Sequence, residues 1–135
     1  MVLLIDANVI LDVLMNRQDF VRDSSMIWKL CETEKAKGNV SALTFANLVY
    51  IKRKQLKAIG IEDIDRELML RFNCTDLCGS DLARADELDW IDVEEAVQSV
   101  TEERIHGDYI IRRNVRDFSK SKVMAFTPSE LLARI

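Results

Sequence analysis

Carboxylates follow short apolar segments at several points along this chain. Asp6 comes directly after residues 2–5, a segment with the length and branching of a buried strand. Asp117 lies in a polar loop after the apolar stretch 108–111, and Glu95 lies in the first turn of an expected helix. Two strand ends and a helix start that each present a carboxylate suit Mg²⁺ or Mn²⁺, which take oxygen ligands and keep several waters. Such an ion can activate water and stabilise charge on a phosphodiester.

Two of these carboxylates also have a structural interpretation. Asp6 can act as the N-cap of a helix that starts at Ala7, although ligand crevices also lie at the carboxyl ends of parallel strands. Asp92 and Glu95 have the spacing of a capping box, and helical periodicity places Glu95 nearly opposite an apolar stripe. A residue in the first helical turn can nevertheless face a cleft beyond the helix end. Both interpretations stay open.

An amide in apolar surroundings is a further candidate. Asn47 lies three residues after Thr44, so the two share a helical face within the apolar stretch 40–51. A buried amide without partners costs about 1–3 kcal/mol. Asn47 therefore either bridges backbone groups or points into a polar cleft.

Positive charge is gathered in two clusters on a chain whose net charge is −4. That net charge argues against a protein that coats nucleic acid by bulk attraction. Each cluster is either a solvated face or a local phosphate contact, and the second contains the stronger candidates. The clusters are Lys52, Arg53, Lys54 and Lys57, and then Arg112, Arg113, Arg116, Lys120 and Lys122.

The composition predicts one ordinary globular domain over residues 1–135, with 48% hydrophobic and 31% charged residues. Cys31, Cys74 and Cys78 do not have zinc-site spacing, and His106 is the single histidine, so any metal should be a hard one held by oxygen. No signal peptide and no apolar run of about 20 residues is visible. We therefore expect a cytoplasmic protein without membrane contact.

Helical and strand patterns alternate along the chain. Strands are expected at residues 2–5, 40–43, 71–75, 108–111 and 123–126. Helices are expected at residues 7–14, 20–36, 44–58, 62–71, 80–88 and 92–104, and from Pro128 onward. Gly38 is expected to end the second helix, and Thr127 to cap the last one. Strands separated by helices predict right-handed crossovers and an α/β fold with a mainly parallel sheet.

Five segments, taken in order, resemble the motifs of PIN-domain nucleases, in particular a bacterial subgroup of toxin-like nucleases. The segments are residues 4–12, 41–51, 92–98, 108–118 and 127–132. The resemblance runs nearly end to end and implies a three-layer α/β/α PIN-like fold. It implies a Mg²⁺- or Mn²⁺-dependent endoribonuclease, commonly the toxin of a toxin–antitoxin pair. RNA and an antitoxin protein are then the expected partners, and a homodimer is left open.

The resemblance also implies roles for individual residues. Asp6, Glu95 and Asp117 would hold the ion, and Asn47 and Asn114 would orient ligands or water. The arginines that could grip substrate phosphates are Arg112, Arg113 and Arg116.

Several of these positions depart from the family pattern. Glu95 stands where the family usually has Asp, Asn47 where most members have Glu, and Arg112 where a Thr is usual. The alternative is therefore a catalytically degenerate PIN scaffold that binds RNA or a protein partner. A phosphate-accepting receiver domain ranks lower, because the sequence has no convincing Lys at a strand end.

Overall fold

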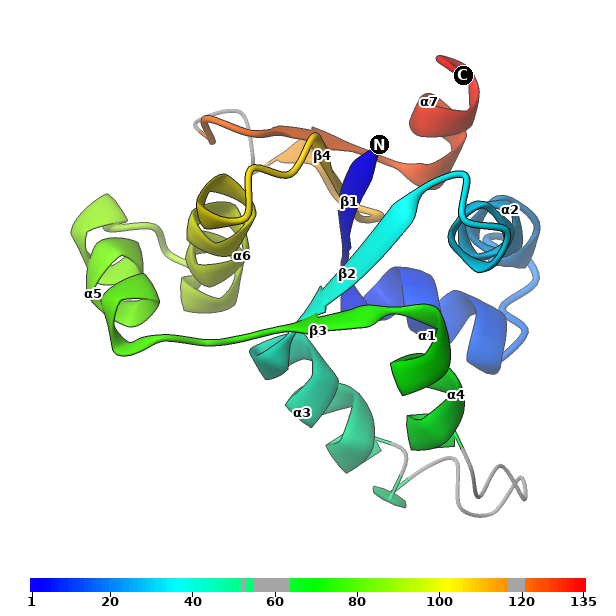
Figure 1. Ribbon diagram of the computed structural model, residues 1–135, viewed down its shortest axis with the longest axis horizontal. Coiled ribbons are helices and arrows are strands. Elements are labelled where there is room, and N and C mark those ends of the chain that lie inside the picture. The colour runs from blue at the N-terminus through cyan, green and yellow to red at the C-terminus, as the bar shows by residue number, and fades with distance from the viewer. Residues whose placement is uncertain (52, 55–63, 117–120) are drawn as a thin grey trace.

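Strands and helices alternate along the chain as the sequence predicts (Figure 1). The computed structural model describes every residue except 52, 55–63 and 117–120. The strands in this part are β1 (Val2–Ile5), β2 (Lys37–Ser41), β3 (Asn73–Thr75), β4 (Tyr109–Ile111) and β5 (Met124–Phe126). The helices are α1 (Ala7–Leu14), α2 (Val21–Glu32), α3 (Ala42–Ile51), α4 (Ile64–Arg71), α5 (Gly79–Leu88), α6 (Val93–Arg104) and α7 (Pro128–Leu132).

The five strands form one sheet in the order β3-β2-β1-β4-β5, and every pairing between them is parallel. β1 lies at the centre, where Leu4 is opposite Asn39 of β2 and Ile110 of β4. A central parallel strand is covered on both faces, which explains why β1 is a continuous apolar run. The predicted parallel sheet is confirmed.

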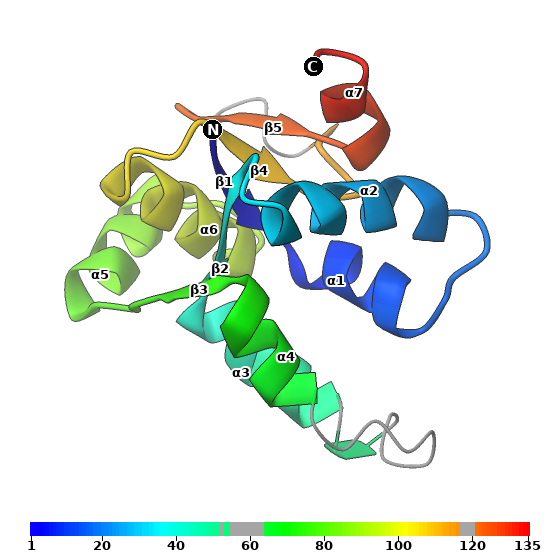
Figure 2. The same ribbon diagram turned by 45° about the vertical axis from the view of Figure 1, so that its right-hand side comes forward.

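Helices cover both faces of this sheet. Leu3 and Ile5 of β1 belong to a core cluster with residues of α1, α2 and α7, whereas Leu4 points to the opposite face with Ile110. Figures 1 and 2 show α5 and α6 on one side of the sheet and α1, α2 and α7 on the other. The three-layer α/β/α arrangement expected from the sequence is therefore confirmed. In the part of the chain that the structure describes, no helix is both long and apolar enough to cross a bilayer.

Side-chain caps set the start of two helices at the carboxyl edge of the sheet, α1 and α6. Asp6 has extended backbone and its carboxylate accepts from the N–H of Asn8, so α1 begins directly after β1. Asp92 does the same for α6, because its Oδ1 accepts from the N–H of Glu95 at 3.1 Å. These caps place the first turns of both helices at the edge where β1 and β4 end.

The sequence analysis expected Gly38 to end the second helix, and this prediction is wrong. α2 stops at Glu32, and the chain turns at Glu34, whose φ is 60°. Gly38 instead lies inside β2, where a Cβ would stand 2.7 Å from Sγ of Cys31 and 2.8 Å from a ring carbon of Phe72. The close packing of Cys31 and Phe72 against the strand therefore requires a glycine at this position. Because Gly38 is part of the strand, β2 starts earlier than predicted.

A buried carboxyl lies near the end of α6 that is farther from these caps. Glu102 is 0% exposed, and neither of its oxygens has a hydrogen-bond partner among the described residues. A Cβ at Gly107 would collide with this carboxyl group, which shows how closely the two residues pack. Burial raises the pKa of Glu102 to about 8, and the nearby Asp108 contributes to the rise.

This burial predicts a pH-dependent stability. Between the ordinary pKa of 4.5 and the folded pKa of about 8, the folded state binds more protons than the unfolded state, so stability falls as pH rises. Glu102→Gln removes the titrating group and should flatten this slope between about pH 5 and pH 8. Urea unfolding at several pH values measures the effect. Equal slopes in the variant and the wild type would contradict the assignment.

Candidate functional site

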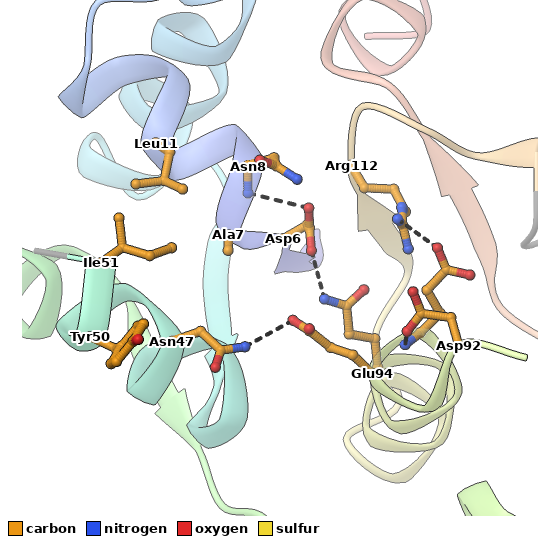
Figure 3. Close-up of a pocket in the computed structure, with 12 residues that line it drawn as sticks. Asp6, Ala7, Asn8, Leu11, Asn47, Tyr50, Ile51, Asp92, Glu94 and Arg112 are labelled. Carbon is orange, nitrogen blue, oxygen red and sulfur yellow. Dashed lines mark hydrogen bonds and ion pairs between the residues drawn. The ribbon is translucent and has the colours of Figure 1, made fainter. Parts of the chain in front are cut away.

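A polar cleft opens at the carboxyl edge of the sheet, beside the ends of β1 and β4 (Figure 3). Its volume is about 410 Å³. Acidic and amide side chains predominate among its polar lining residues, and a small apolar group completes it. The lining residues are Asp6, Ala7, Asn8, Leu11, Asn47, Tyr50, Ile51, Asp92, Glu94, Glu95, Gln98 and Arg112. The structure thus brings together Asp6, Asn47, Glu95 and Arg112 from the residues that the sequence singled out.

Asp6 is held at the floor of the cleft and is only 7% exposed. Its Oδ2 accepts from the N–H of Asn8 at 3.3 Å, and its Oδ1 accepts from Nε2 of Gln98 at 2.7 Å. One donor comes from α1 and the other from α6, so the carboxylate is fixed between two helices. The predicted helix cap is confirmed, and the same side chain faces the cleft (Figure 3).

Glu94 presents a second carboxylate to the same cleft. Its Oε1 accepts from Nδ2 of Asn47 at 3.2 Å, which joins α6 to α3 across the cleft (Figure 3). Burial raises the pKa of the Glu94 carboxyl, and the negative charge of Asp6 raises it further. The hydrogen bond from Asn47 opposes this rise. Among the four described acidic residues that line the cleft, the charges of Asp6 and Glu94 therefore repel each other.

Glu95 lines the cleft, as one of the two interpretations of the sequence expects, but it contacts Arg112 there. Its backbone N–H is capped by Asp92, but its carboxylate turns to the loop after β4, where Oε1 accepts from Nη2 of Arg112 at 2.9 Å. The side chains of Arg112 and Glu95 are 11% and 12% exposed. This buried ion pair lies beside Asp6 and Glu94, and it places one fixed positive charge in an acidic cleft.

Among the described residues, Asn114, Arg113 and Arg116 are not part of the cleft lining. Asn114 is exposed, and its Oδ1 accepts from the N–H of Arg116 in a local turn. Arg113 donates to Oδ1 of Asn8 at 3.1 Å and stacks on Phe20, with 4.5 Å between its guanidinium carbon and the ring centroid. Arg116 is exposed. Asp117 lies outside the described residues, as do Lys52, Lys57 and Lys120 of the basic clusters.

The sequence analysis missed two residues that contact the predicted ones, Glu94 and Gln98. They are four residues apart and therefore share one face of α6. The sequence contained a signal for the burial of Gln98, because this residue lies between the apolar residues Val97 and Val100. In the structure Gln98 is 2% exposed. Periodicity assigned polar residues of α6 to solvent, whereas packing between the sheet and α5 buries the helix from Glu95 to Glu102 on all sides.

Oxygen donors in the cleft fit a divalent metal ion of the hard class. Asp6 and Glu94 supply two carboxylates, and Oε1 of Gln98 is buried without a hydrogen-bond partner among the described residues. Mg²⁺ is commonly bound by one or two carboxylates and retains several waters. Within the described ranges, no group of three or more His, Cys, Asp or Glu is arranged to hold a metal. Asp6 and Glu94 with the amide oxygen of Gln98 are therefore suitable donors. The other two described acids of the cleft contact protein groups, Asp92 as the cap of α6 and Glu95 as the partner of Arg112.

The ion pair of Arg112 and Glu95 predicts a measurable coupling. Arg112→Met should lower the free energy of unfolding by roughly 3 kcal/mol, because the buried Glu95 carboxylate loses the cation that it contacts. Adding Glu95→Gln should recover part of this loss, since the neutral amide costs less to bury. Urea unfolding of the wild type, both single variants and the double variant measures the coupling. Strictly additive losses would show that the pair contributes no interaction energy.

Comparisons with known proteins agree with this architecture. A family model described as the PIN domain matches residues 2–116, whereas a search of curated proteins gave no match. A toxin–antitoxin complex from Klebsiella pneumoniae superposes with a TM-score of 0.70 at 20% identity, covering 93% of this chain and 96% of that one.

Two other solved structures are similar. For VapBC2 from Rickettsia felis bound to a promoter DNA fragment, the TM-score is 0.68 and the identity 12%, with coverage of 94% and 98%. For FitAcB from Neisseria gonorrhoeae, the values are 0.67 and 19%, with coverage of 96% and 99%. At such low sequence identities, the similarity to these structures shows a shared fold and nothing beyond it. Because the family model spans most of the sequence, the chain belongs to the PIN-domain family.

Proposed function

We propose that this protein is a metal-dependent endoribonuclease that hydrolyses phosphodiester bonds in the cleft at the carboxyl edge of its sheet. The observation that carries the proposal is the pair of carboxylates, Asp6 and Glu94, that share this cleft. Asp6 raises the pKa of Glu94, and repulsion of this kind is what a bound divalent cation relieves.

Asp6 and Glu94 would hold the ion, together with water. When bound, the ion would supply Lewis-acid stabilisation of the phosphodiester and lower the pKa of a water molecule. Asn8 and Gln98 position Asp6 through their hydrogen bonds, so its carboxylate loses little freedom when substrate arrives. Asn47 positions Glu94 in the same way.

Glu94 is also suited to accept a proton. Asn47 donates to Oε1 of Glu94, so the second carboxylate oxygen can accept a proton from a water molecule in the cleft. In the proposed step, water adds to phosphorus, the bond from phosphorus to the leaving sugar oxygen breaks, and Glu94 accepts the proton that water loses. The leaving oxygen takes a proton from solvent.

The other residues chosen from the sequence keep narrower proposed roles. Glu95 holds Arg112 in the cleft, where the guanidinium balances part of the acidic charge. Arg113 and Arg116 remain candidates for contacts with substrate phosphates, and Arg116 is the more exposed of the two. Asp117 and Asn114 remain proposals from the family pattern, as third metal ligand and as orienting residue.

A toxin role in a toxin–antitoxin pair is the biological setting that we propose. It is supported by the membership of the PIN family and by the similar structures, which are toxin–antitoxin or VapBC and FitAB-type complexes. The partner would then be an antitoxin protein. Expression of this chain alone should arrest bacterial growth, and failure to do so would count against the toxin role.

The second candidate is a catalytically degenerate PIN scaffold that binds RNA or a protein. Two observations favour it. Glu95 is engaged by Arg112, and no group of three metal-binding His, Cys, Asp or Glu side chains lies among the described residues. Metal-dependent cleavage separates the two candidates.

Asp6→Asn should lower Mn²⁺-dependent RNA cleavage by about 100-fold or more, because it removes the charge that would hold the ion. The amide keeps one oxygen for the cap of α1, and rotation of the Gln98 amide would turn its Oε1 toward the new N–H group, so the thermal melt should change little. Cleavage of single-stranded RNA and Mn²⁺ calorimetry would be measured on both proteins. Equal cleavage by both would remove Asp6 from the mechanism, and the absence of cleavage and of Mn²⁺ binding in the wild type would favour the scaffold.

Glu94→Gln and Glu95→Gln form a matched pair of neighbouring isosteric changes. Glu94→Gln should lower cleavage by about 100-fold and should remove the loss of rate on acidification that protonation of Glu94 causes. Glu95→Gln should lower cleavage by less than roughly tenfold, since its carboxylate contacts Arg112. Cleavage rates measured across pH show which of the two glutamates acts in the reaction. A larger loss of rate in Glu95→Gln than in Glu94→Gln would indicate that Glu95 is the acid that acts on substrate.

A further inference from the structure

The cleft has a second wall that the proposed chemistry does not use. Leu11, Tyr50 and Ile51 face the carboxylates from α1 and α3 (Figure 3). Tyr50 is the most accessible of them, with 58% of its surface exposed. It lies three residues after Asn47, so the aromatic ring is on the same face of α3 as the side chain that positions Glu94.

Positive charge lies directly beside this ring. Nζ of Lys54 is 4.8 Å from the ring centroid of Tyr50, and Arg53 is exposed next to it. The ammonium group occupies one side of the ring, while more than half of the residue remains accessible. An aromatic ring with an adjacent cation matches a nucleotide, whose base can stack while its phosphate meets the cation.

The acidic floor makes such a contact important when no cation is bound. Asp6, Asp92 and Glu94 line the cleft and repel a polyanion, so without the metal ion phosphate contacts there give little net attraction. The binding free energy then comes from groups beside the acids, and base stacking is independent of the charge of the backbone. A base that stacks must be unpaired, because a duplex keeps its base faces covered.

We propose that Tyr50 is the stacking platform for one unpaired base of a single-stranded RNA, next to the phosphodiester that lies over Asp6 and Glu94. Lys54 contacts a phosphate of the same strand. The inference deepens the proposed nuclease function, since it names the side chain that holds a base of the substrate, and it rests on that function for the identity of the ligand.

The test is the affinity for a short fluorescent oligoadenosine RNA, measured by anisotropy in EDTA so that no cleavage occurs. Tyr50→Leu should weaken binding by about 5- to 100-fold, the range that removal of one stacking side chain produces. Tyr50→Phe keeps the ring and should bind within about twofold of the wild type. Met26→Ala is the matched surface control on α2, away from the cleft, and should leave affinity unchanged. An RNA that lacks bases should bind equally to the wild type and to Tyr50→Leu.

Other results overturn the proposal. Unchanged affinity in Tyr50→Leu, or an equal loss in Tyr50→Phe, would exclude stacking on the ring. Thermal melts show whether each variant is folded, since Tyr50 is exposed and its replacement should leave the melt unchanged. Tyr50-dependent binding without metal-dependent cleavage would refute the nuclease function and support the platform. Asp6-dependent cleavage with unchanged affinity and KM in Tyr50→Leu would support the nuclease and refute the platform.

Discussion

Parallel pairing of β1 with both of its neighbours is the constraint on which the cleft depends. The register sets Ile5 opposite Ile111, and the N–H of Asp6 donates to the carbonyl of Ile111 at 2.9 Å. The residues that follow β1 and β4 therefore leave the sheet at the same edge, although about a hundred positions separate them in the chain. α1 begins there, and the first turn of α6 reaches the same edge from the other face of the sheet, so backbone hydrogen bonds and two capped helices bring Asp6, Glu94 and Arg112 together.

Within this edge, three carboxylates have three different environments. Asp6 accepts two N–H donors, and Glu95 is paired with a guanidinium. Glu94 receives an amide donor from Asn47, and its pKa rises because of burial and because Asp6 is near. Neighbouring acids in one cleft can thus have different chemical roles. Their hydrogen bonds and nearby charges decide which carboxylate binds a cation, which one is protonated and which one pairs with an arginine.

Burying the polar side chains of α6 costs free energy, and an ion pair between α5 and α6 offsets part of this cost. Asp81 of α5 is 0% exposed, and its carboxylate accepts hydrogen bonds from both Nε and Nη2 of Arg104. A bidentate ion pair therefore joins α5 to α6. Near the same end of α6, Glu102 is buried without such a partner among the described residues. The layer therefore combines a strong polar contact with an unfavourable one, and the position of α6 against the cleft is maintained by packing as well as by charge.

The order of the elements, the parallel sheet, the caps at Asp6 and Thr127 and the gathering of Asp6 and Asn47 could be predicted from the sequence. These features are encoded locally, in the apolar strand pattern, in capping residues and in the rule that strand ends share an edge. The choice between Glu94 and Glu95, the contact of Gln98 with Asp6 and the place of Gly38 could not be predicted in this way. Each depends on which face of an element meets another layer, and helical periodicity cannot assign the faces of a helix that is buried on all sides. Only the tertiary packing of α6 between the sheet and α5 decided that, of these two cleft residues, Glu94 meets Asn47 and Glu95 meets Arg112.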